Sequence, residues 1–174
     1  MHALTAPTGR FQTLTALFLL VAMIATVGSA LGFEHIGGYM PCLLCLEQRT
    51  PYYIGIPVMA LAFISATLKW PGIVNRGLLA VGGLLMAYGL ALAVYHAGVE
   101  WQFWEGPADC AAAATSITTD VGSLLNDLNT VRPPSCSEAA LRVLGLSFAG
   151  WNVIASLILA AVAFRAAFRK TGNS

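Results

Sequence analysis

The sequence predicts an all-α membrane protein, a bundle of four transmembrane helices, on three observations. The 174 residues are 57% hydrophobic and only 10% charged, whereas soluble domains carry about 25% charged residues. Four apolar stretches are each long enough, at about 1.5 Å per residue, to cross a hydrocarbon core of about 30 Å. Basic residues gather on alternate connections. The chain shows no basic patch with interleaved aromatics, so no nucleic-acid partner is expected.

The chain is expected to form one integral membrane domain over residues 1–174, surrounded by the lipid bilayer. The predicted spans cover residues 14–33, 51–68, 77–97 and 143–164. The first stretch also resembles a secretory signal peptide, because Arg10 precedes an apolar run that ends in the small residues 28–30. That run exceeds the usual apolar region of about 7–15 residues, and further spans follow, so a transmembrane helix is favoured.

The start of the second span is open to two interpretations. Thr50 and Pro51 suit the N-cap and first position of a helix. Alternatively, the helix begins near Leu43, and Pro51 kinks it by removing the hydrogen bond to the Glu47 carbonyl. In both cases two cysteines lie at the N-terminal end of this span.

Two extracytoplasmic loops are expected, over residues 34–50 and 98–142. The second contains apolar residues at helical spacing, which predict a short amphipathic helix: Ile117, Val121, Leu124, Leu125 and Leu128. This helix would lie flat on the membrane surface or pack on residues of its own loop.

Charge predicts the orientation of the bundle. One side would carry none of the eight acidic residues and six of the nine basic ones, namely Arg10, Lys69, Arg76, Arg165, Arg169 and Lys170. The positive-inside rule then places both termini in the cytoplasm. All four cysteines would lie on the opposite, oxidising side, where disulfides persist.

Cys42 and Cys45 form a Cys-X-X-Cys pair, which can close a readily reduced disulfide. No second Cys-X-X-Cys or His pair completes a zinc site, and no histidine follows Cys45 as haem attachment requires. A structural disulfide remains an alternative, but redox chemistry is favoured. If Cys45 and Arg49 share one helix, they lie one turn apart, and the guanidinium would favour a thiolate on Cys45.

Cys110 and Cys136 form a second pair, in the long loop. Disulfide exchange proceeds by thiolate attack through mixed disulfides, so electrons could pass from this loop pair to the pair at the membrane edge. An ordinary extracytoplasmic disulfide is the alternative interpretation of the loop pair.

Several separate motifs resemble the bacterial disulfide bond formation protein B (DsbB) family. They are Cys42-Leu-Leu-Cys45-Leu-Glu-Gln-Arg49, Tyr95-His96-Ala-Gly-Val-Glu100, Phe103-Trp104-Glu-Gly-Pro107 with Cys110, Pro134-Ser-Cys136-Ser, and Leu144-Gly-Leu-Ser-Phe-Ala-Gly-Trp151-Asn152. The resemblance spans about residues 14–165 and keeps the order and spacing of the four cysteines.

The resemblance implies an inner-membrane enzyme that reoxidises a periplasmic DsbA-like dithiol oxidase and passes two electrons to a membrane quinone. By position, Cys110 would form the mixed disulfide with that partner, and Cys136 would be its loop partner. Cys42 would exchange with the loop pair, while Cys45 as a thiolate would contact the quinone. The resemblance leaves open whether the quinone is ubiquinone or menaquinone.

Two further residues are expected near the quinone. Arg49 matches the family arginine that supports the quinone and the thiolate. His96, at the end of the third span, could donate a hydrogen bond to a quinone carbonyl or be an interfacial histidine without such a role. Glu47 and Gln48 receive no role from the resemblance, because these positions vary in the family. No metal ligands are expected.

Two other functions compete with the quinone-linked oxidase. A non-enzymatic membrane assembly or binding protein would hold the four cysteines in two static disulfides. A reductase would run the same relay in reverse, as the vitamin K epoxide reductase family does, but the motifs around Cys110 and Cys136 favour the oxidase.

Overall fold

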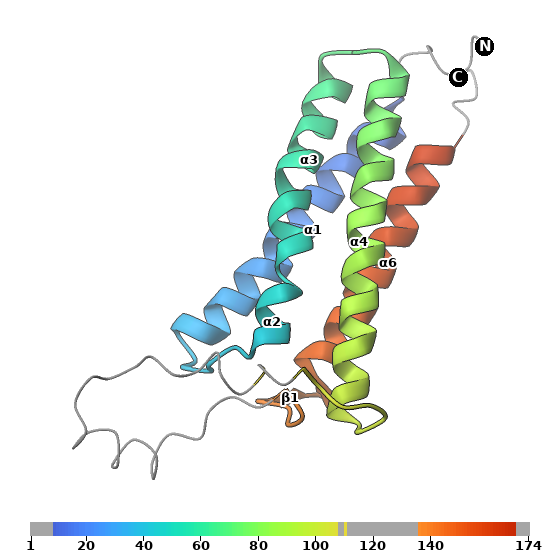
Figure 1. Ribbon diagram of the computed structural model, residues 1–174. Helices are drawn as coiled ribbons and strands as arrows, with labels where there is room; N and C mark the ends of the chain where they lie inside the picture. The colour runs from blue at the N-terminus through green and yellow to red at the C-terminus, as the bar shows by residue number, and fades with distance from the viewer. Residues whose placement is uncertain (1–8, 108–109, 111–135, 170–174) are drawn as a thin grey trace, which may run out of the picture.

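Four long helices run side by side in the computed structural model, which describes residues 9–107, 110 and 136–169 (Figure 1). They are α1 (Arg10–His35), α3 (Thr50–Thr67), α4 (Gly72–Glu100) and α6 (Phe148–Phe168), and a short helix α2 (Leu43–Glu47) precedes α3. Each long helix, α3 together with α2, is apolar and long enough to cross a membrane. The predicted fold class is therefore confirmed for the part of the chain that is described. The amphipathic helix predicted within residues 117–128 lies outside it.

The second span consists of a short helix followed by a long one. Each of the two interpretations of its start therefore predicts the beginning of one of these helices correctly. A helix does begin at Leu43, but it ends at Glu47, with Gln48 as its C-cap. A new helix begins at Thr50, with Arg49 in the N-cap position. Cys45 and Arg49 therefore belong to different helices, and the assumption that they share one continuous helix is wrong.

A two-stranded antiparallel hairpin, β1 (Arg142–Val143) and β2 (Leu146–Ser147), leads into α6. Its turn contains Leu144 and Gly145, both with positive φ, which glycine adopts without a steric penalty. The Ser147 hydroxyl then caps α6 by accepting the Gly150 N–H at 3.1 Å. The last helix consequently begins at Phe148, later than the predicted boundary at residue 143.

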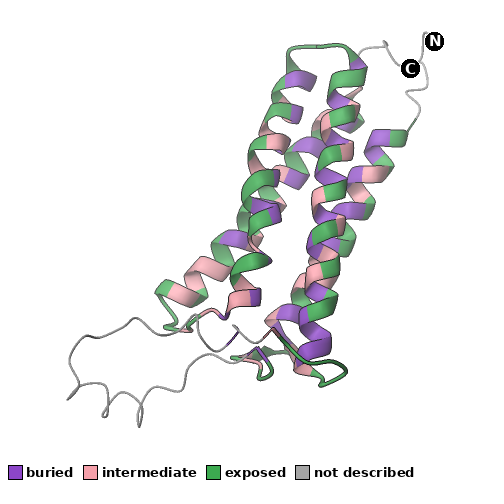
Figure 2. Ribbon diagram, in the orientation of Figure 1, coloured by how far each residue is buried: buried purple, intermediate pink, exposed green. Residues whose placement is uncertain are grey.

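The interior of the bundle is built from small residues and methionines. Met23, Met59 and Met86 are fully buried. An added Cβ at Gly83 would lie 2.8 Å from the Phe164 ring, so this glycine permits α4 and α6 to pack closely. The outward faces carry exposed apolar side chains, as the alternation of buried and exposed residues along each helix shows (Figure 2), which suits helices surrounded by lipid.

The two ends of the bundle differ in chemistry. The start of α1, the α3–α4 connection and the end of α6 lie together at one end (Figure 1). The opposite end, called here the cysteine end, carries α2, the β-hairpin and the C-terminus of α4. All four cysteines belong to this end.

Candidate functional site at the cysteine end

Cys42 and Cys45 are free thiols whose sulfur atoms lie 2.8 Å apart. Cys42 is the N-cap of α2, with an extended backbone, and its Sγ accepts the backbone N–H of Cys45 at 3.3 Å. The cap turns the chain so that the two side chains face each other. Cys42 is buried and Cys45 is partly exposed, so the two thiols have different surroundings.

The surroundings of Cys42 favour its thiolate. Three donors meet its sulfur: the Cys45 thiol, the Cys45 N–H, and the His96 ring, whose Nε2 lies 3.7 Å away. The hydrogen bond from the Cys45 thiol, with smaller contributions from His96, lowers the pKa of Cys42 from 9.0 to about 5 against the opposing effect of burial. In this dithiol state the surroundings thus favour the thiolate on Cys42, while the thiolate on Cys45 toward a bound quinone stays a prediction.

The loop cysteines, Cys110 and Cys136, are joined in a disulfide with Cα atoms 5.9 Å apart. This disulfide packs against Cys42, Leu44 and Val99 in a small buried cluster. Two segments far apart in sequence thus bring all four sulfur atoms to one place at the cysteine end.

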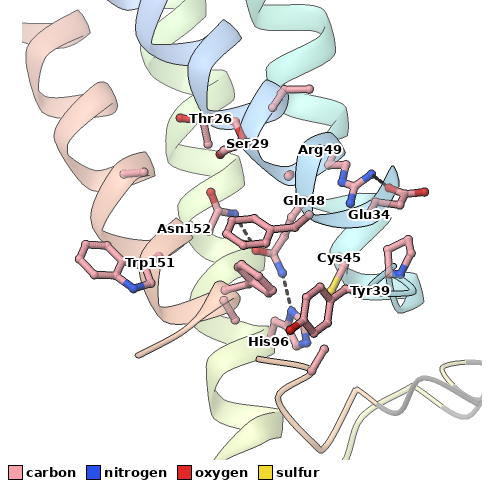
Figure 3. A pocket seen from close by; sticks show the side chains of 18 of the residues that line it. Thr26, Ser29, Glu34, Tyr39, Cys45, Gln48, Arg49, His96, Trp151 and Asn152 are labelled. Atoms are coloured by element: carbon pink, nitrogen blue, oxygen red, sulfur yellow. Dashed lines mark hydrogen bonds and ion pairs between the residues drawn. The ribbon is translucent and has the colours of Figure 1, made fainter. Parts of the chain in front are cut away.

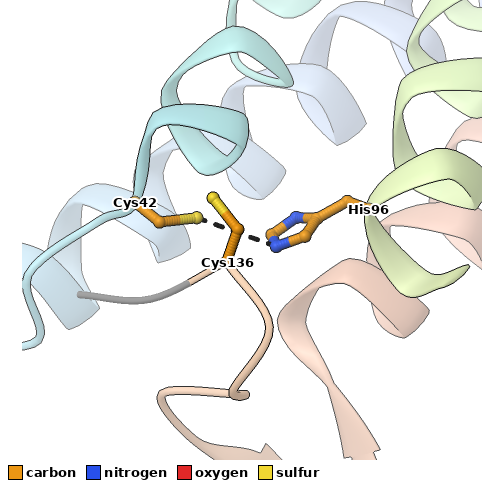
Figure 4. A group of neighbouring side chains, drawn as sticks. All are labelled: Cys42, His96 and Cys136. Atoms are coloured by element: carbon orange, nitrogen blue, oxygen red, sulfur yellow. Dashed lines mark hydrogen bonds between the residues drawn. The ribbon is translucent and has the colours of Figure 1, made fainter. Parts of the chain in front are cut away.

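Cys136 is close enough to Cys42 for direct sulfur exchange after a small movement. Cys42 Sγ, Cys136 Sγ and a ring nitrogen of His96 all lie within 4.8 Å of one another and are buried (Figure 4). The same three atoms would resemble a metal-binding trio, but the sulfur of Cys136 is already bonded to Cys110. A nucleophilic sulfur beside a disulfide sulfur is the geometry that thiol–disulfide exchange requires.

A cavity of about 400 Å³ adjoins the other thiol of the pair. The three predicted cofactor-binding residues, Cys45, Arg49 and His96, all line it (Figure 3). Most of the remaining lining is apolar and comes from α1, the α1–α2 connection and α6, including Val27, Phe33, Tyr39, Phe148 and Trp151. A flat, largely apolar ring with polar oxygens suits such a cavity, because most ligand sites combine apolar walls with a few placed polar groups.

Arg49 lies at the edge of this cavity, ion-paired with Glu34 at the end of α1 (Figure 3). The exposed fractions of the two side chains are 12% and 25%, so the pair is partly shielded from solvent. The Arg49 guanidinium therefore reaches the cavity with its charge partly compensated by a carboxylate that the sequence did not indicate as its partner.

His96 is buried, one helical turn before the end of α4. The predicted third span ended at residue 97, but α4 continues to Glu100, so His96 lies inside a helix instead of at its end. Its two ring nitrogens meet different groups. Nε2 faces Cys42 at 3.7 Å, and Nδ1 lies 2.6 Å from the amide nitrogen of Gln48.

Sequence reasoning missed four polar residues that adjoin this site: Gln48, Tyr52, Asn152 and Ser156. They form a continuous chain of hydrogen bonds from α6 to His96. The spacing of Asn152 and Ser156, one turn apart in an otherwise apolar span, was the available indication, because polar residues inside membrane spans commonly serve a function.

Comparisons with known proteins agree with the geometry. The family model for disulfide bond formation protein DsbB matches residues 12–166. Disulfide bond formation protein B of Ralstonia nicotianae is 33% identical over 158 residues, covering 83% of this chain and 88% of the relative. Disulfide bond formation protein B 2 of Pseudomonas putida is 31% identical over 153 residues, covering 87% of each chain.

An uncharacterised protein of Rickettsia prowazekii is also similar, at 25% identity over 154 residues, covering 86% of this chain and 84% of the relative. No solved structure gave a significant match. The family match spans nearly the whole described fold and includes all four cysteines of the site. The chain is a disulfide-forming membrane oxidoreductase and belongs to the DsbB family.

Proposed function

We propose that the protein reoxidises a periplasmic DsbA-like dithiol oxidase and passes the electrons through its two cysteine pairs to a membrane quinone. The observation that carries this proposal is the placement of the Cys42–Cys45 pair between two features. Cys42 faces the loop disulfide through Cys136, and Cys45 faces the cavity. One pair is therefore in contact with both an electron source and a site for an acceptor.

The exchange steps balance without any added oxidant. A partner thiolate attacks Cys110, which forms a mixed disulfide and releases Cys136 as a thiolate. The second partner thiol then releases the oxidised partner and leaves Cys110 and Cys136 reduced. Cys136 next attacks Cys42 of a Cys42–Cys45 disulfide, and Cys110 resolves the resulting Cys42–Cys136 bond.

The products of these steps match the described state, in which the loop disulfide is formed and Cys42 and Cys45 are thiols. Two electrons have then moved from the partner to the membrane-edge pair. A bound quinone, either ubiquinone or menaquinone, would be the final acceptor of two electrons and two protons. The Cys42–Cys45 pair would then return to a disulfide.

Three side chains would hold the quinone headgroup. Arg49 offers a fixed positive charge and hydrogen-bond donors to an oxygen of the ring. Cys45 would lie against the ring, and His96 borders the same cavity. The apolar walls from α1 and α6 would contact the rest of the ring and exclude water.

The orientation follows from charge and from this chemistry. With the basic end in the cytoplasm, both termini are cytoplasmic and the cysteine end faces the periplasm. The protein would thus be a multi-pass protein of the bacterial inner membrane, with its disulfides on the oxidising side.

Anaerobic mixing of the purified protein with a reduced DsbA-like partner and a quinone tests the proposal. We expect quinone absorbance to fall in proportion to the partner disulfide that forms, and both changes to stop in the Cys45→Ser variant. A reductase would oxidise quinol instead. Partner oxidation without loss of quinone would reject the quinone as acceptor.

A further inference from the structure

The polar residues beside the cysteines form one hydrogen-bonded chain that runs from α6 to Cys42. Tyr52 Oη donates to Asn152 Oδ1 at 2.6 Å, and Ser156 Oγ lies 3.0 Å from Tyr52 Oη and 3.3 Å from Asn152 Oδ1. Asn152 Nδ2 donates to Gln48 Oε1 at 2.6 Å. Gln48 Nε2 in turn donates to His96 Nδ1 at 2.6 Å (Figure 3).

The direction of this chain fixes the tautomer of His96. An amide NH₂ group can only donate, so Nδ1 must accept and carries no proton. The ring proton of a neutral His96 then lies on Nε2, which faces the Cys42 sulfur at 3.7 Å (Figure 4). Each of the two amides uses its oxygen on one side and its nitrogen on the other, so the orientation of either amide sets that of the other.

A separate contact favours the same direction. Glu100 Oε1 lies 3.9 Å from His96 Nε2, and both side chains are almost fully buried. If the two amides were reversed, an unprotonated Nε2 would face a carboxylate and a sulfur, both of which are acceptors. A protonated Nε2 instead gives both groups a donor. The titratable groups facing Cys42 and His96 in the described part of the chain are thus Cys45 and Glu100.

We propose that Gln48 and Asn152 are positioning residues that hold His96 as the Nε2–H tautomer, so that its N–H stabilises the thiolate of Cys42. The inference rests on the proposed function for its purpose, because Cys42 is the thiolate released when Cys110 resolves the Cys42–Cys136 bond. The proposed role of His96 is toward the sulfur atom of Cys42 and does not depend on a quinone. The amide pair acts through the ring and touches no reacting atom.

The step that the tautomer assists can be isolated from both the partner and the quinone. In a Cys45→Ser variant, the Cys42 thiolate can attack Cys136, form a Cys42–Cys136 disulfide and release Cys110 as a thiolate that takes a proton from water. The serine introduced in this variant keeps a hydroxyl donor beside Cys42. Mass spectrometry of alkylated peptides measures the rate of this internal exchange at each pH.

The first measurement is the ¹⁵N NMR spectrum of imidazole-labelled protein, in which a protonated ring nitrogen and a bare one have well-separated shifts. The chain has only three histidines, so His2→Gln and His35→Gln variants assign the resonances of His96. We expect Nε2 protonated and Nδ1 bare. The opposite assignment would overturn the proposal.

The second measurement compares variants of the chain. Gln48→Met keeps the length of the side chain but removes the donor to Nδ1, so Nδ1 should become partly protonated. The loss of one hydrogen bond to a charged sulfur should move the pH profile of exchange up by about one unit. The rate should therefore fall about tenfold at pH values below the pKa of Cys42, where it follows the thiolate fraction, and change little at neutral pH. Asn152→Leu, one link further away, should give a smaller change in the same direction.

Asn75→Leu is the matched control. Asn75 is a fully buried amide on the same helix as His96, bonded to the Ala62 carbonyl at 2.6 Å and to Ser65, and it lies near the other end of the bundle. The Asn75→Leu variant loses a comparable buried hydrogen bond, and residue 75 does not contact the site. A merely structural role for Gln48 predicts that both variants lose stability and that neither changes the ¹⁵N spectrum or the pH profile of exchange.

The outcomes separate the two proposals. Unchanged ¹⁵N shifts and an unchanged pH profile of exchange in Gln48→Met would reject the positioning role of the amides and leave the proposed function intact. The expected shifts and rates together with no quinone reduction by the parent protein would support the positioning role and reject the quinone-linked function.

Discussion

Glu34 and Arg49 join the end of α1 to the start of α3 through an ion pair at the edge of the cavity. The pair couples the helix that forms one wall of the cavity to the residue predicted to bind the cofactor. Because both side chains are largely shielded from solvent, the carboxylate holds the guanidinium in one place. A charge-assisted bond of this kind is stronger than a neutral one.

Arg49→Gln should weaken quinone binding while leaving dithiol exchange with the partner nearly intact. A hydrogen bond to a charged group contributes about 1.5–3 kcal/mol, so the apparent KM for quinone should rise by about tenfold or more. Arg49→Lys should recover part of the loss, since it restores a charge without the planar fork. Initial rates of quinone absorbance change at several quinone concentrations give these values.

Two further variants identify the role of the ion pair. Glu34→Gln keeps an oxygen acceptor for Arg49 but removes the compensating charge, so quinone affinity should not fall. Arg10→Gln removes an exposed arginine at the opposite end of the bundle and should have no effect. A tenfold loss of quinone affinity in Glu34→Gln would mean that the ion pair acts by holding α1 and α3 together. The charge of Arg49 would then not be what binds the quinone.

The two loop cysteines should behave differently toward the partner. Cys110→Ser should abolish the mixed disulfide, because the attacked sulfur is gone. Cys136→Ser leaves Cys110 free to pair with the partner and should let the mixed disulfide accumulate, since the loop partner is missing. Non-reducing electrophoresis detects the complex. Equal amounts of mixed disulfide in both variants would contradict the different roles assigned to Cys110 and Cys136.

The thiolate of Cys42 should be present across the neutral pH range. Its pKa is lowered from 9.0 to about 5, so the folded state favours the thiolate above pH 5. The stability that this ionisation contributes is fully present above pH 9 and is lost as the pH falls through about 5. Ultraviolet absorbance of the thiolate, in protein whose loop disulfide is intact, should show a step near pH 5.

A Cys42→Ser variant supplies the control for that titration, because the step should disappear with the sulfur. Thiolate absorbance that first appears near pH 9 in the parent protein would show that the donors around Cys42 do not stabilise its charge.

The orientation of the bundle is also testable. Reporter fusions after Lys69 and after Asn173 should be cytoplasmic, and a fusion near Ser123 should be periplasmic, because the positive-inside rule predicts cytoplasmic basic connections. A cytoplasmic result at Ser123 would place the long loop in a reducing compartment and contradict the proposed relay.

The sequence alone determined the class of the fold and the family, and it predicted which sulfur atoms react. Apolar runs of membrane length allow few structures, because a backbone in lipid must satisfy its own hydrogen bonds and forms helices or closed barrels. The spacing of Cys42 and Cys45, and the motifs around Cys110 and Cys136, were sufficient to indicate the family. These features are local, so they can be recognised without knowing which helices touch.

Only the tertiary structure decided which groups surround each sulfur. The break between α2 and α3 separates Cys45 from Arg49, and Glu34 from another helix becomes the partner of that arginine. Gln48 meets His96 and Asn152 across separations of 48 and 104 residues. Hydrogen bonds between helices depend on how each helix is rotated and displaced against its neighbours, and helical periodicity in a uniformly apolar span does not specify either.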